Sequence, residues 1–191
     1  MGGVVFVEML IVGITGQVAC GKGEIIGVGQ EEYGFEVVTL SDCLKQEAEE
    51  RGLKIVRRNL QNLGDLLRRE RGPGILVEMA IDRADSRKVK RLIIDGVRSV
   101  GEVKVIKKNG WMVGVETDFE RRLKWYLKRG KDMDSLTKES FEEIYIRENS
   151  GKNDEEMNID RCMRLVDFVI ENSGTKEMLF KKGREVYQKV I

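Results

Sequence analysis

The sequence predicts an α/β protein in which helices cover both faces of a five-stranded parallel sheet. Five apolar runs of strand length alternate along the chain with segments of helix length, and this alternation is typical of parallel sheets. The length of 191 residues suits one domain with a single core. The sequence has no internal repeat and no linker rich in Pro, Gly or Ser, so we expect residues 1–191 to form a single domain.

The expected strands are short apolar runs. The first, "MLIVGIT" at 9–15, is continuous, rich in β-branched residues and followed by glycine, which is typical of a strand buried on both faces. In open α/β sheets, ligands bind outside the carboxyl ends of the strands. We therefore expect residues 16–22, Asp42, Asp95 and Asn172 to lie at one edge of the sheet. The other four expected strands span residues 35–40, 91–97, 111–117 and 166–172.

The helices are predicted from apolar periodicity and from residues that begin or end a helix. Ser41 or Asp42 is expected to cap the helix after the second strand. Leucines at helical spacing predict a helix over 58–71, and Pro73 suits the first turn of the next helix. The helices expected along the chain span residues 22–33, 42–51, 58–71, 73–85, 99–109, 118–129, 137–150, 155–164 and 175–190.

The charges and the cysteines argue against several kinds of function. Lys plus Arg number 34 and Asp plus Glu number 33, so no overall field favours nucleic acid or an acidic membrane. The chain has no histidine and no C-x-x-C pair among its three cysteines, which argues against the usual zinc sites and a His-dependent triad. This cysteine usage predicts a cytoplasmic location. The apolar stretch before residue 15 is interrupted by Glu8 and is too short to span a bilayer.

The stretch "GQVACGKGE" at 16–24 contains the pattern G-x-x-x-x-G-K, with Gly16, Gly21 and Lys22 at the fixed positions. A buried strand is expected before it and a helix after it, which is the context that a phosphate-binding loop requires. Glycines let backbone N–H groups turn inward around an anion, the helix points its positive end at the same place, and Lys22 adds a full charge. The stretch therefore predicts a nucleotide site.

The loop departs from the usual pattern after Lys22. A Ser or Thr is expected there to help hold magnesium, whereas this chain has Gly23 and then Glu24. A carboxylate at a helix N-terminus stabilises the empty protein by about 0.3–1 kcal/mol, but it repels bound phosphates unless Mg²⁺ lies between them. Two alternatives are open: Glu24 turns aside or supports the metal and the site works, or the site binds nucleotide poorly.

A second acid is expected beside the loop. The strand "RLIID" ends in Asp95, and Mg²⁺ takes oxygen ligands of this kind together with several waters. The alternative is a turn aspartate, which commonly precedes glycine. We expect Asp95 to lie on the metal side of the nucleotide.

Six stretches resemble one group of proteins in their order and spacing: "GITGQVACGKGE", "LSDCLKQEAEERGL", "NLGDLLRRERGPG", "LIIDGVRSVGEV", "DFERRLKWYLKRG" and "VDFVIENSGT". The group is the small P-loop kinases of the nucleoside-monophosphate kinase and dephospho-CoA kinase type, and in particular its adenylate-kinase-like members from archaea and bacteria. The resemblance covers nearly the whole chain from Met9 onward. It implies the three-layer P-loop NTPase fold, a mobile acceptor-binding segment at about 42–87 and a mobile lid at about 118–152. It also implies transfer of the γ-phosphoryl group of ATP, with Mg²⁺, to a small nucleotide-like acceptor.

The resemblance implies a role for each matching residue. Phosphoryl transfer needs alignment, and positive charge where negative charge spreads in the transition state. The residues expected to bind the nucleotide are Gly16, Cys20, Gly21, Lys22, Gly23, Glu24, Asn172 and Gly174. Those expected to bind the acceptor are Asp42, Arg68, Asp95 and Arg98, and those expected to hold the metal are Asp95 and Glu24. Those expected to act in catalysis are Lys22, Asp42, Arg122, Arg129 and Arg147.

The acceptor is left open. The first hypothesis is a nucleoside or deoxynucleoside monophosphate, and the alternatives are dephospho-CoA or a non-catalytic nucleotide-binding protein with a degraded loop, which Glu24 favours. Asp42 is expected to act as a helix cap, as a functional acid, or as both. Trp125 and Tyr126 are expected to pack rather than to stack on a base. The expected partner is a small molecule, neither nucleic acid nor membrane, and the chain is expected to be a monomer or a homodimer.

Overall fold

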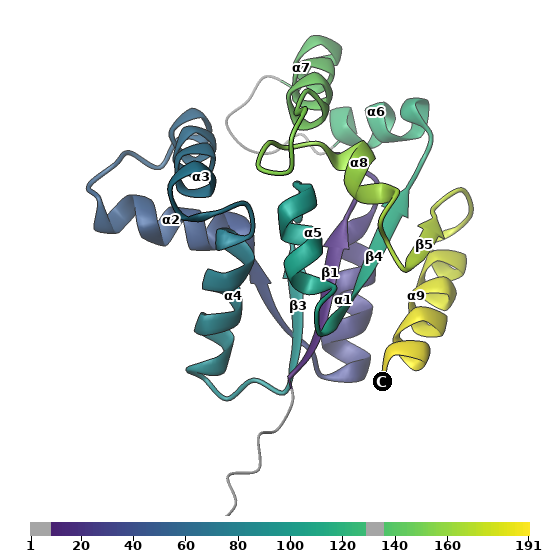
Figure 1. Cartoon of the computed structure of the whole chain (residues 1–191). Coiled ribbons are helices and arrows are strands. Elements are labelled where there is room, and N and C mark those ends of the chain that lie inside the picture. The colour runs from purple at the N-terminus through teal and green to yellow at the C-terminus, as the bar shows by residue number, and fades with distance from the viewer. Residues whose placement is uncertain (1–8, 129–135) are drawn as a thin grey trace, which may run out of the picture.

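A parallel sheet of five strands forms the centre of the molecule (Figure 1). The computed structural model describes residues 9–128 and 136–191. The strands are β1 (Leu10–Thr15), β2 (Glu36–Thr39), β3 (Arg91–Asp95), β4 (Gly110–Glu116) and β5 (Phe168–Glu171). They lie in the order β2-β3-β1-β4-β5 and each neighbouring pair is parallel, which confirms the predicted fold.

Helices surround the sheet. Those in the described ranges are α1 (Lys22–Tyr33), α2 (Leu40–Glu50), α3 (Arg57–Arg71), α4 (Ile75–Asp85), α5 (Val100–Ile106), α6 (Phe119–Lys128), α7 (Lys138–Asn149), α8 (Ile159–Met163) and α9 (Lys176–Val190).

The two faces of the sheet bury different side chains. In β3, Leu92 and Ile94 belong to the core formed with α2 to α5 and α8, whereas Ile93 belongs to the core formed with α1 and α9. This division follows from the strand itself, because successive side chains point to opposite faces. Since both faces are covered, β1 is apolar at nearly every position and β3 carries three consecutive buried apolar residues between Arg91 and Asp95.

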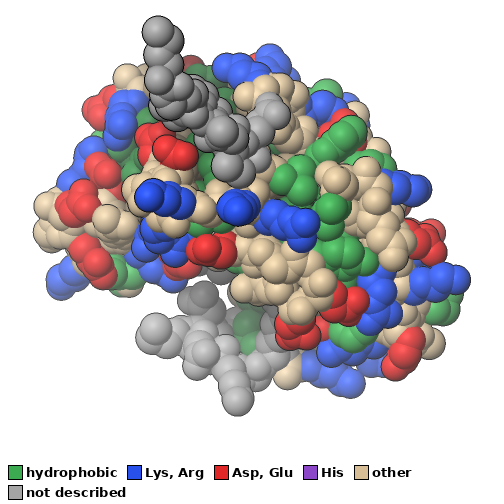
Figure 2. Space-filling model, turned by 90° about the horizontal axis from the view of Figure 1, so that it is seen from below, with side chains coloured by type: hydrophobic (Ala, Val, Ile, Leu, Met, Phe, Trp, Pro, Cys, Tyr) green, Lys and Arg blue, Asp and Glu red, His purple; other side chains and the backbone are tan. Residues whose placement is uncertain are grey.

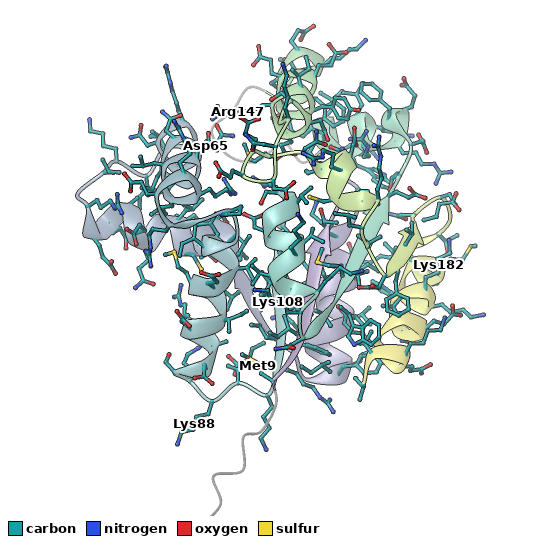
Figure 3. All side chains as sticks on the ribbon, in the orientation of Figure 1. Met9, Asp65, Lys88, Lys108, Arg147 and Lys182 are labelled. Carbon is teal, nitrogen blue, oxygen red and sulfur yellow. The ribbon has the colours of Figure 1, made fainter. Side chains whose placement is uncertain are left out.

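The carboxyl ends of the strands meet at one edge of the sheet, as the sequence predicts. Asp95 at the end of β3 pairs with Ile14 of β1 on one side and with Thr39 of β2 on the other. Helices α3 and α7 lie beyond this edge (Figure 1). Figure 3 shows Asp65 and Arg147 at the same end, far from Lys88 at the other end of the molecule. The division of the chain into an acceptor-binding segment and a lid stays a prediction.

The start of α2 differs from the expectation. Thr39 caps this helix, because its hydroxyl oxygen accepts a hydrogen bond of 3.0 Å from the backbone N–H of Asp42. Strand β2 passes into α2 without a loop, so the last strand residue takes the cap position and Asp42 lies in the first turn. The prediction that Ser41 or Asp42 caps α2 is therefore wrong.

Two later helices, by contrast, begin further along the chain than expected. Helix α4 begins at Ile75 after the N-cap Gly74, so Pro73 lies before the helix. Between 155 and 164 the chain forms only the short α8, whose N-cap Asn158 accepts a hydrogen bond from the backbone N–H of Arg161. A polar N-cap begins a helix where its side chain can reach the free N–H groups, and here that position is Asn158.

Charge is mixed over the surface at the amino ends of the strands. Figure 2 shows Lys and Arg side chains interspersed with Asp and Glu on this face, in agreement with the near balance of charges in the sequence. Among the helices of the described ranges, none has the length and apolar character needed to cross a membrane.

Candidate active site

The loop of residues 16–21 joins β1 to α1 and needs glycine at two positions. Gly16 has φ +145° and Gly21 has φ +98°, backbone conformations that other residues rarely adopt. A Cβ at Gly16 would lie 2.3 Å from the carbonyl oxygen of Val115, and one at Gly21 would lie 2.4 Å from Nδ2 of Asn172. The loop is therefore packed against the ends of two other strands, with no room for side chains at these glycines.

Side chains of residues that follow β4 and β5 donate hydrogen bonds to the backbone of the loop. The carbonyl oxygen of Cys20 accepts hydrogen bonds from Oγ1 of Thr117 (2.9 Å) and from Nδ2 of Asn172 (3.0 Å). Asn172 is buried behind the loop and also lines a neighbouring pocket, so its expected place beside the nucleotide stays a prediction. Thr117 was not among the predicted site residues, because a Thr placed directly after a strand is too weak a signal to single it out.

Lys22 lies over the concave side of the loop. Its Nζ donates to the carbonyl oxygens of Gly16 (2.5 Å) and Gln17 (3.2 Å). The loop, Asp95, Arg98 and Glu148 line a pocket of about 270 Å³, which we call the loop pocket. A nest of backbone amides at a helix N-terminus with one lysine is suited to bind phosphate groups.

Asp95 lines the loop pocket, and one of its carboxylate oxygens has no hydrogen-bond partner in the described part of the chain. This oxygen, Oδ1, is buried. Because buried polar atoms normally have a partner, a free oxygen here suits a ligand that brings its own positive charge or donor. No cluster of three or more His, Cys, Asp or Glu side chains suited to a metal occurs in the described ranges. One carboxylate, completed by phosphate oxygens and waters, fits the way Mg²⁺ binds beside nucleotides.

Glu24 lies apart from Asp95. Its carboxylate forms an ion pair of 3.0 Å with Nζ of Lys176 at the start of α9, and it does not line the loop pocket. It lines a neighbouring pocket of about 450 Å³ together with Gly23, Trp125, Asn172 and Gly174, among others. We call this second space the outer pocket. The structure therefore does not bring the two expected metal ligands together.

A third pocket lies on the other side of Asp95. It has a volume of about 230 Å³ and opens between α2, α3 and β3, and we call it the acceptor pocket. Asp95 and Arg98 line both this pocket and the loop pocket. Apolar side chains form much of the wall. The lining residues are Thr39, Leu40, Ser41, Leu44, Leu60, Gln61, Gly64, Arg68, Leu76, Asp95, Gly96, Arg98 and Met157.

Asp42 is not part of this wall. Its carboxylate is half exposed and pairs with Nζ of Lys45 at 2.8 Å. The hydrogen bond from Lys45 lowers the pKa of Asp42. Because Asp42 lies in the first turn of α2, Thr39 and Ser41 line the pocket in its place.

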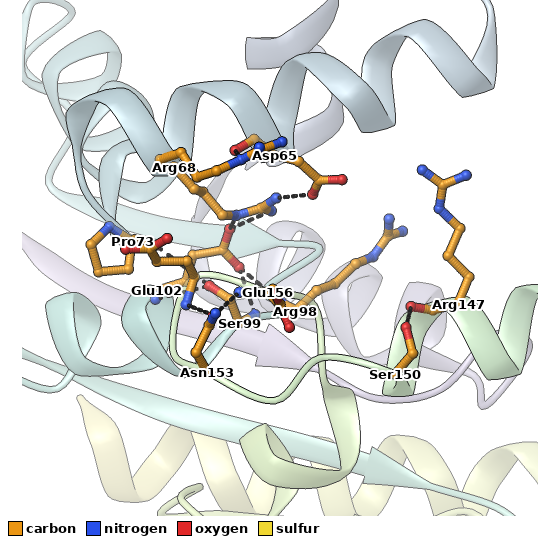
Figure 4. A network of polar contacts seen from close by, with 12 residues as sticks. Asp65, Arg68, Pro73, Arg98, Ser99, Glu102, Arg147, Ser150, Asn153 and Glu156 are labelled. Carbon is orange, nitrogen blue, oxygen red and sulfur yellow. Dashed lines mark hydrogen bonds and ion pairs between the residues drawn. The ribbon is translucent and has the colours of Figure 1, made fainter.

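Arg68 is buried in a network of polar contacts (Figure 4). Its Nε and Nη2 donate to Oε1 of Glu102 at 3.1 and 2.8 Å, and its Nη1 lies 3.4 Å from Asp65. Glu102 also accepts hydrogen bonds from the backbone N–H groups of Arg98 (2.7 Å) and Ser99 (3.0 Å), closing a capping box at α5. The charge of Arg68 is therefore largely compensated within the protein. Ser-x-x-Glu is a recognisable capping signal that the sequence analysis did not use.

The expected lid arginines lie in different surroundings. Arg122 is buried between the rings of Phe119, Phe141 and Tyr145, 5.5 to 5.8 Å from their centroids. Its Nε donates to the carbonyl oxygen of Thr117, its Nη1 has no partner in the described part of the chain, and burial lowers its pKa.

Of the other two expected lid arginines, Arg147 is described by the structure and does not line the loop pocket. Arg147 lines a polar cavity of about 510 Å³ between α3 and α7, opposite Asp65 and Arg69. In Figure 4 its side chain extends toward α3, as does that of Arg98. Arg129 lies outside the described residues.

Comparison with known proteins identifies relatives along the whole chain. A family model described as an AAA domain matches residues 15–140. A UPF0200 protein of Thermococcus gammatolerans is 30% identical over 189 residues, covering 95% of this chain and 96% of the relative. A UPF0200 protein of Aeropyrum pernix is 28% identical over 185 residues, covering 95% and 94%.

Solved structures share the fold. TT1252 from Thermus thermophilus has a TM-score of 0.63 at 19% identity, covering 96% of this chain and 99% of that one. Shikimate kinase from Acinetobacter baumannii, in complex with shikimate, has a TM-score of 0.57 at 12% identity, covering 97% and 94%. Dephospho-CoA kinase from Campylobacter jejuni has a TM-score of 0.50 at 16% identity, covering 96% and 98%. These similarities show a P-loop kinase-like fold.

Proposed function

Because the chain belongs to the AAA_17 family, described as an AAA domain, and to the UPF0200 group, we propose that it is an ATP-dependent kinase. It transfers the γ-phosphoryl group of ATP to a nucleoside or deoxynucleoside monophosphate. The observation that carries this proposal is the wall shared by the loop pocket and the acceptor pocket, which contains Asp95 and Arg98. Two adjoining pockets with an acid and a cation between them suit a donor and an acceptor that meet there.

The triphosphate occupies the loop pocket. Backbone N–H groups of residues 16–21 cradle its oxygens, and Lys22 exchanges the carbonyl groups of Gly16 and Gln17 for phosphate oxygens. Asp95, which lines this pocket, would hold Mg²⁺ directly or through water. When bound, Mg²⁺ neutralises charge that develops on the phosphate oxygens.

The base of ATP occupies the outer pocket. Trp125 is half-buried and lines this space, while the adjacent Tyr126 is buried against Phe141. The exposed part of the Trp125 indole therefore offers a flat apolar surface to the purine. In this respect the proposal departs from the expectation that both residues only pack. Gly174 and Asn172 form the opposite side of the same space.

Arg98 favours a phosphate acceptor over an uncharged one. Its side chain is 39% exposed, lines the acceptor pocket and pairs with one carboxylate, that of Glu148 at 3.5 Å. Arg68 is buried and pairs with two carboxylates, those of Glu102 and Asp65. An acceptor phosphate would bind Arg98 and lie beside the γ-phosphoryl group. Apolar side chains of Leu44, Leu60 and Leu76 would pack on its nucleoside.

A second candidate acceptor is a hydroxyl group, as in dephospho-CoA. The carboxylate of Asp95 in the wall of the acceptor pocket supports it, because a carboxylate beside the acceptor can orient a hydroxyl group and take its proton. The non-catalytic alternative has less support, since the carboxylate of Glu24 pairs with Lys176 and does not line the loop pocket.

A transfer assay tests the proposal. The protein is incubated with γ-labelled ATP, Mg²⁺ and single acceptors: each ribo- and deoxyribonucleoside monophosphate, and dephospho-CoA. We expect label in one class of monophosphate, and loss of transfer in Lys22→Ala and Asp95→Asn. Label in dephospho-CoA alone would select the second candidate. No labelled product, together with no rise in melting temperature on adding Mg²⁺ and ATP, would refute the kinase.

A further inference from the structure

The last turn of α7 contacts both halves of the proposed site. Glu148 lies beside Arg98, which lines the loop and acceptor pockets, and its carboxylate Oε1 is 3.5 Å from Nε of that arginine. The next residue, Asn149, exchanges hydrogen bonds with the side chain of Gln17 in the phosphate loop, at 3.1 and 3.2 Å. One helix end is thus linked to the donor side and to the acceptor side.

The link to the phosphate loop is reinforced by α8. Gln17 also donates to Oδ1 of Asp160 at 2.6 Å, and the backbone N–H of Asp160 donates to Oδ1 of Asn149 at 2.9 Å. Tyr145, one turn earlier on α7, donates to the second oxygen of Asp160, and the nearby carboxylate raises the pKa of this tyrosine. These contacts hold the end of α7 in one position relative to the loop.

Glu148 is a buried acid in a pocket suited to phosphate. The residue is 3% exposed and lines the loop pocket. Burial of a carboxylate is unfavourable unless a cation or donors compensate it, and within the described residues its ion-pair partner is Arg98. A carboxylate in this place repels a triphosphate unless the cation stays beside it. The pair therefore keeps the guanidinium of Arg98 at the boundary of the two pockets.

We infer that Glu148 is the residue that positions Arg98 for the acceptor, and that Asn149 and Gln17 hold Glu148 in register with the phosphate loop. The inference rests on the proposed function, since it assigns Arg98 to an acceptor phosphate. Glu148 is a positioning residue for the acceptor. It acts by orienting Arg98. Its loss therefore weakens the binding of ligands that reach the acceptor pocket and leaves unchanged the binding of those that occupy only the loop and outer pockets.

Two probes separate these effects. AMP-PNP with Mg²⁺ reports the donor side alone, and diadenosine pentaphosphate, which joins two nucleosides through one phosphate chain, spans both pockets. Dissociation constants are measured by calorimetry for the wild type, Glu148→Gln, Arg98→Gln and the double variant. Glu148→Asp tests rescue by a shorter acid. Glu143→Gln, the same change at an exposed position of α7, is the matched control, and the melting temperature of each variant is recorded.

We expect Glu148→Gln to weaken binding of the pentaphosphate about fivefold or more. The affinity for AMP-PNP should stay unchanged or rise, because a negative charge is removed. The effect should vanish in the Arg98→Gln background, and Glu148→Asp should restore part of it. Glu143→Gln should alter neither constant. The inference is wrong if Glu148→Gln weakens both probes equally, if its effect persists without Arg98, or if the pentaphosphate binds no tighter than AMP-PNP. A wild-type protein that binds neither probe would instead contradict the proposed function.

Discussion

Nδ2 of Asn172 donates a hydrogen bond of 3.0 Å to the carbonyl oxygen of Cys20, which joins the end of β5 to the phosphate loop across 152 residues. The same oxygen accepts from Thr117 after β4. The orientation of the loop therefore depends on two other strands as well as on its own glycines. A change at Asn172 should affect nucleotide binding even though the side chain is buried beneath the loop.

Asn172→Ala is expected to destabilise the protein by about 1–3 kcal/mol, because it removes a buried donor and leaves the carbonyl group with one partner fewer. The affinity for Mg²⁺ and ATP should fall as well, because the loop then loses one of the hydrogen bonds that fix its orientation. Urea unfolding and calorimetry measure the two effects. Asn109→Ala, at an exposed turn, is the matched control and should change neither quantity.

Gly21 and Gly23 are two residues apart and are expected to respond in opposite ways to alanine. A Cβ at Gly21 meets Nδ2 of Asn172 at 2.4 Å in a conformation of φ +98°, whereas a Cβ at Gly23 has no atom within 4 Å. Gly21→Ala should therefore lower the free energy of unfolding by more than about 1 kcal/mol. Gly23→Ala, in the first turn of α1, should leave it equal or raise it by up to about 1 kcal/mol. Equal losses in urea unfolding would contradict this account of the loop.

The loop and the acid at the end of β3 could be predicted from the sequence because each depends on a short contiguous pattern. Gly16, Gly21 and Lys22 derive their function from local backbone geometry, and Asp95 follows directly from an apolar strand. The sheet could also be predicted, since strands buried on both faces contain continuous apolar runs, as β1 and the centre of β3 do. Boundaries were less accurate where a strand runs into a helix, as at Thr39.

The contacts between distant segments could not be read from the sequence. Glu148 and Asn149 resemble any charged and polar pair on an exposed helix, and their partners Arg98 and Gln17 lie far away in the chain. Arg68 was expected to bind the acceptor and does line the acceptor pocket, but its pairing with the buried carboxylate of Glu102 could not be predicted from the sequence. Such pairings depend on how α3, α5 and α7 pack, which periodicity alone does not determine.

Trp125 is expected to report nucleotide binding through its fluorescence. The chain has two tryptophans, and Trp111 packs on Phe168 near the start of β4, away from the outer pocket. Trp111→Phe therefore leaves one fluorophore beside the proposed base. Addition of ATP with Mg²⁺ should change its emission in a saturable way. Trp125→Ala should lower the affinity for ATP by about tenfold, a loss within the 1–3 kcal/mol that a stacked base contributes. An emission that inorganic triphosphate changes equally would contradict base stacking.

Glu24→Thr, which introduces the hydroxyl group expected in related loops, should alter the rate of ATP consumption by no more than about threefold. The ion pair with Lys176 directs the carboxylate away from the loop pocket, and partly exposed pairs of this kind contribute little to stability. The rate is measured with Mg²⁺ for the wild type, Glu24→Thr and Glu24→Gln. A gain of a hundredfold would mean that Glu24 impairs the natural site, and a comparable loss would make it a participant.

Stability at high pH is expected to depend on Cys162. Burial raises the pKa of this thiol from 9.0 to about 12 in the folded protein. Between these values the unfolded chain releases a proton that the folded chain keeps, so the free energy of unfolding falls as pH rises, by at most about 1.4 kcal/mol per unit. Below pH 9 this loss is absent.

Cys162→Ala removes the titrating group and should flatten this decline, although it lowers stability near pH 7 because it leaves a small cavity. Burial also raises the pKa of Tyr187, so part of the decline should persist in the variant. Urea unfolding at pH 7, 9 and 10.5 gives both slopes. Equal slopes for the two proteins would show that Cys162 does not keep its proton in the folded state, and its burial on α8 in the core would then need revision.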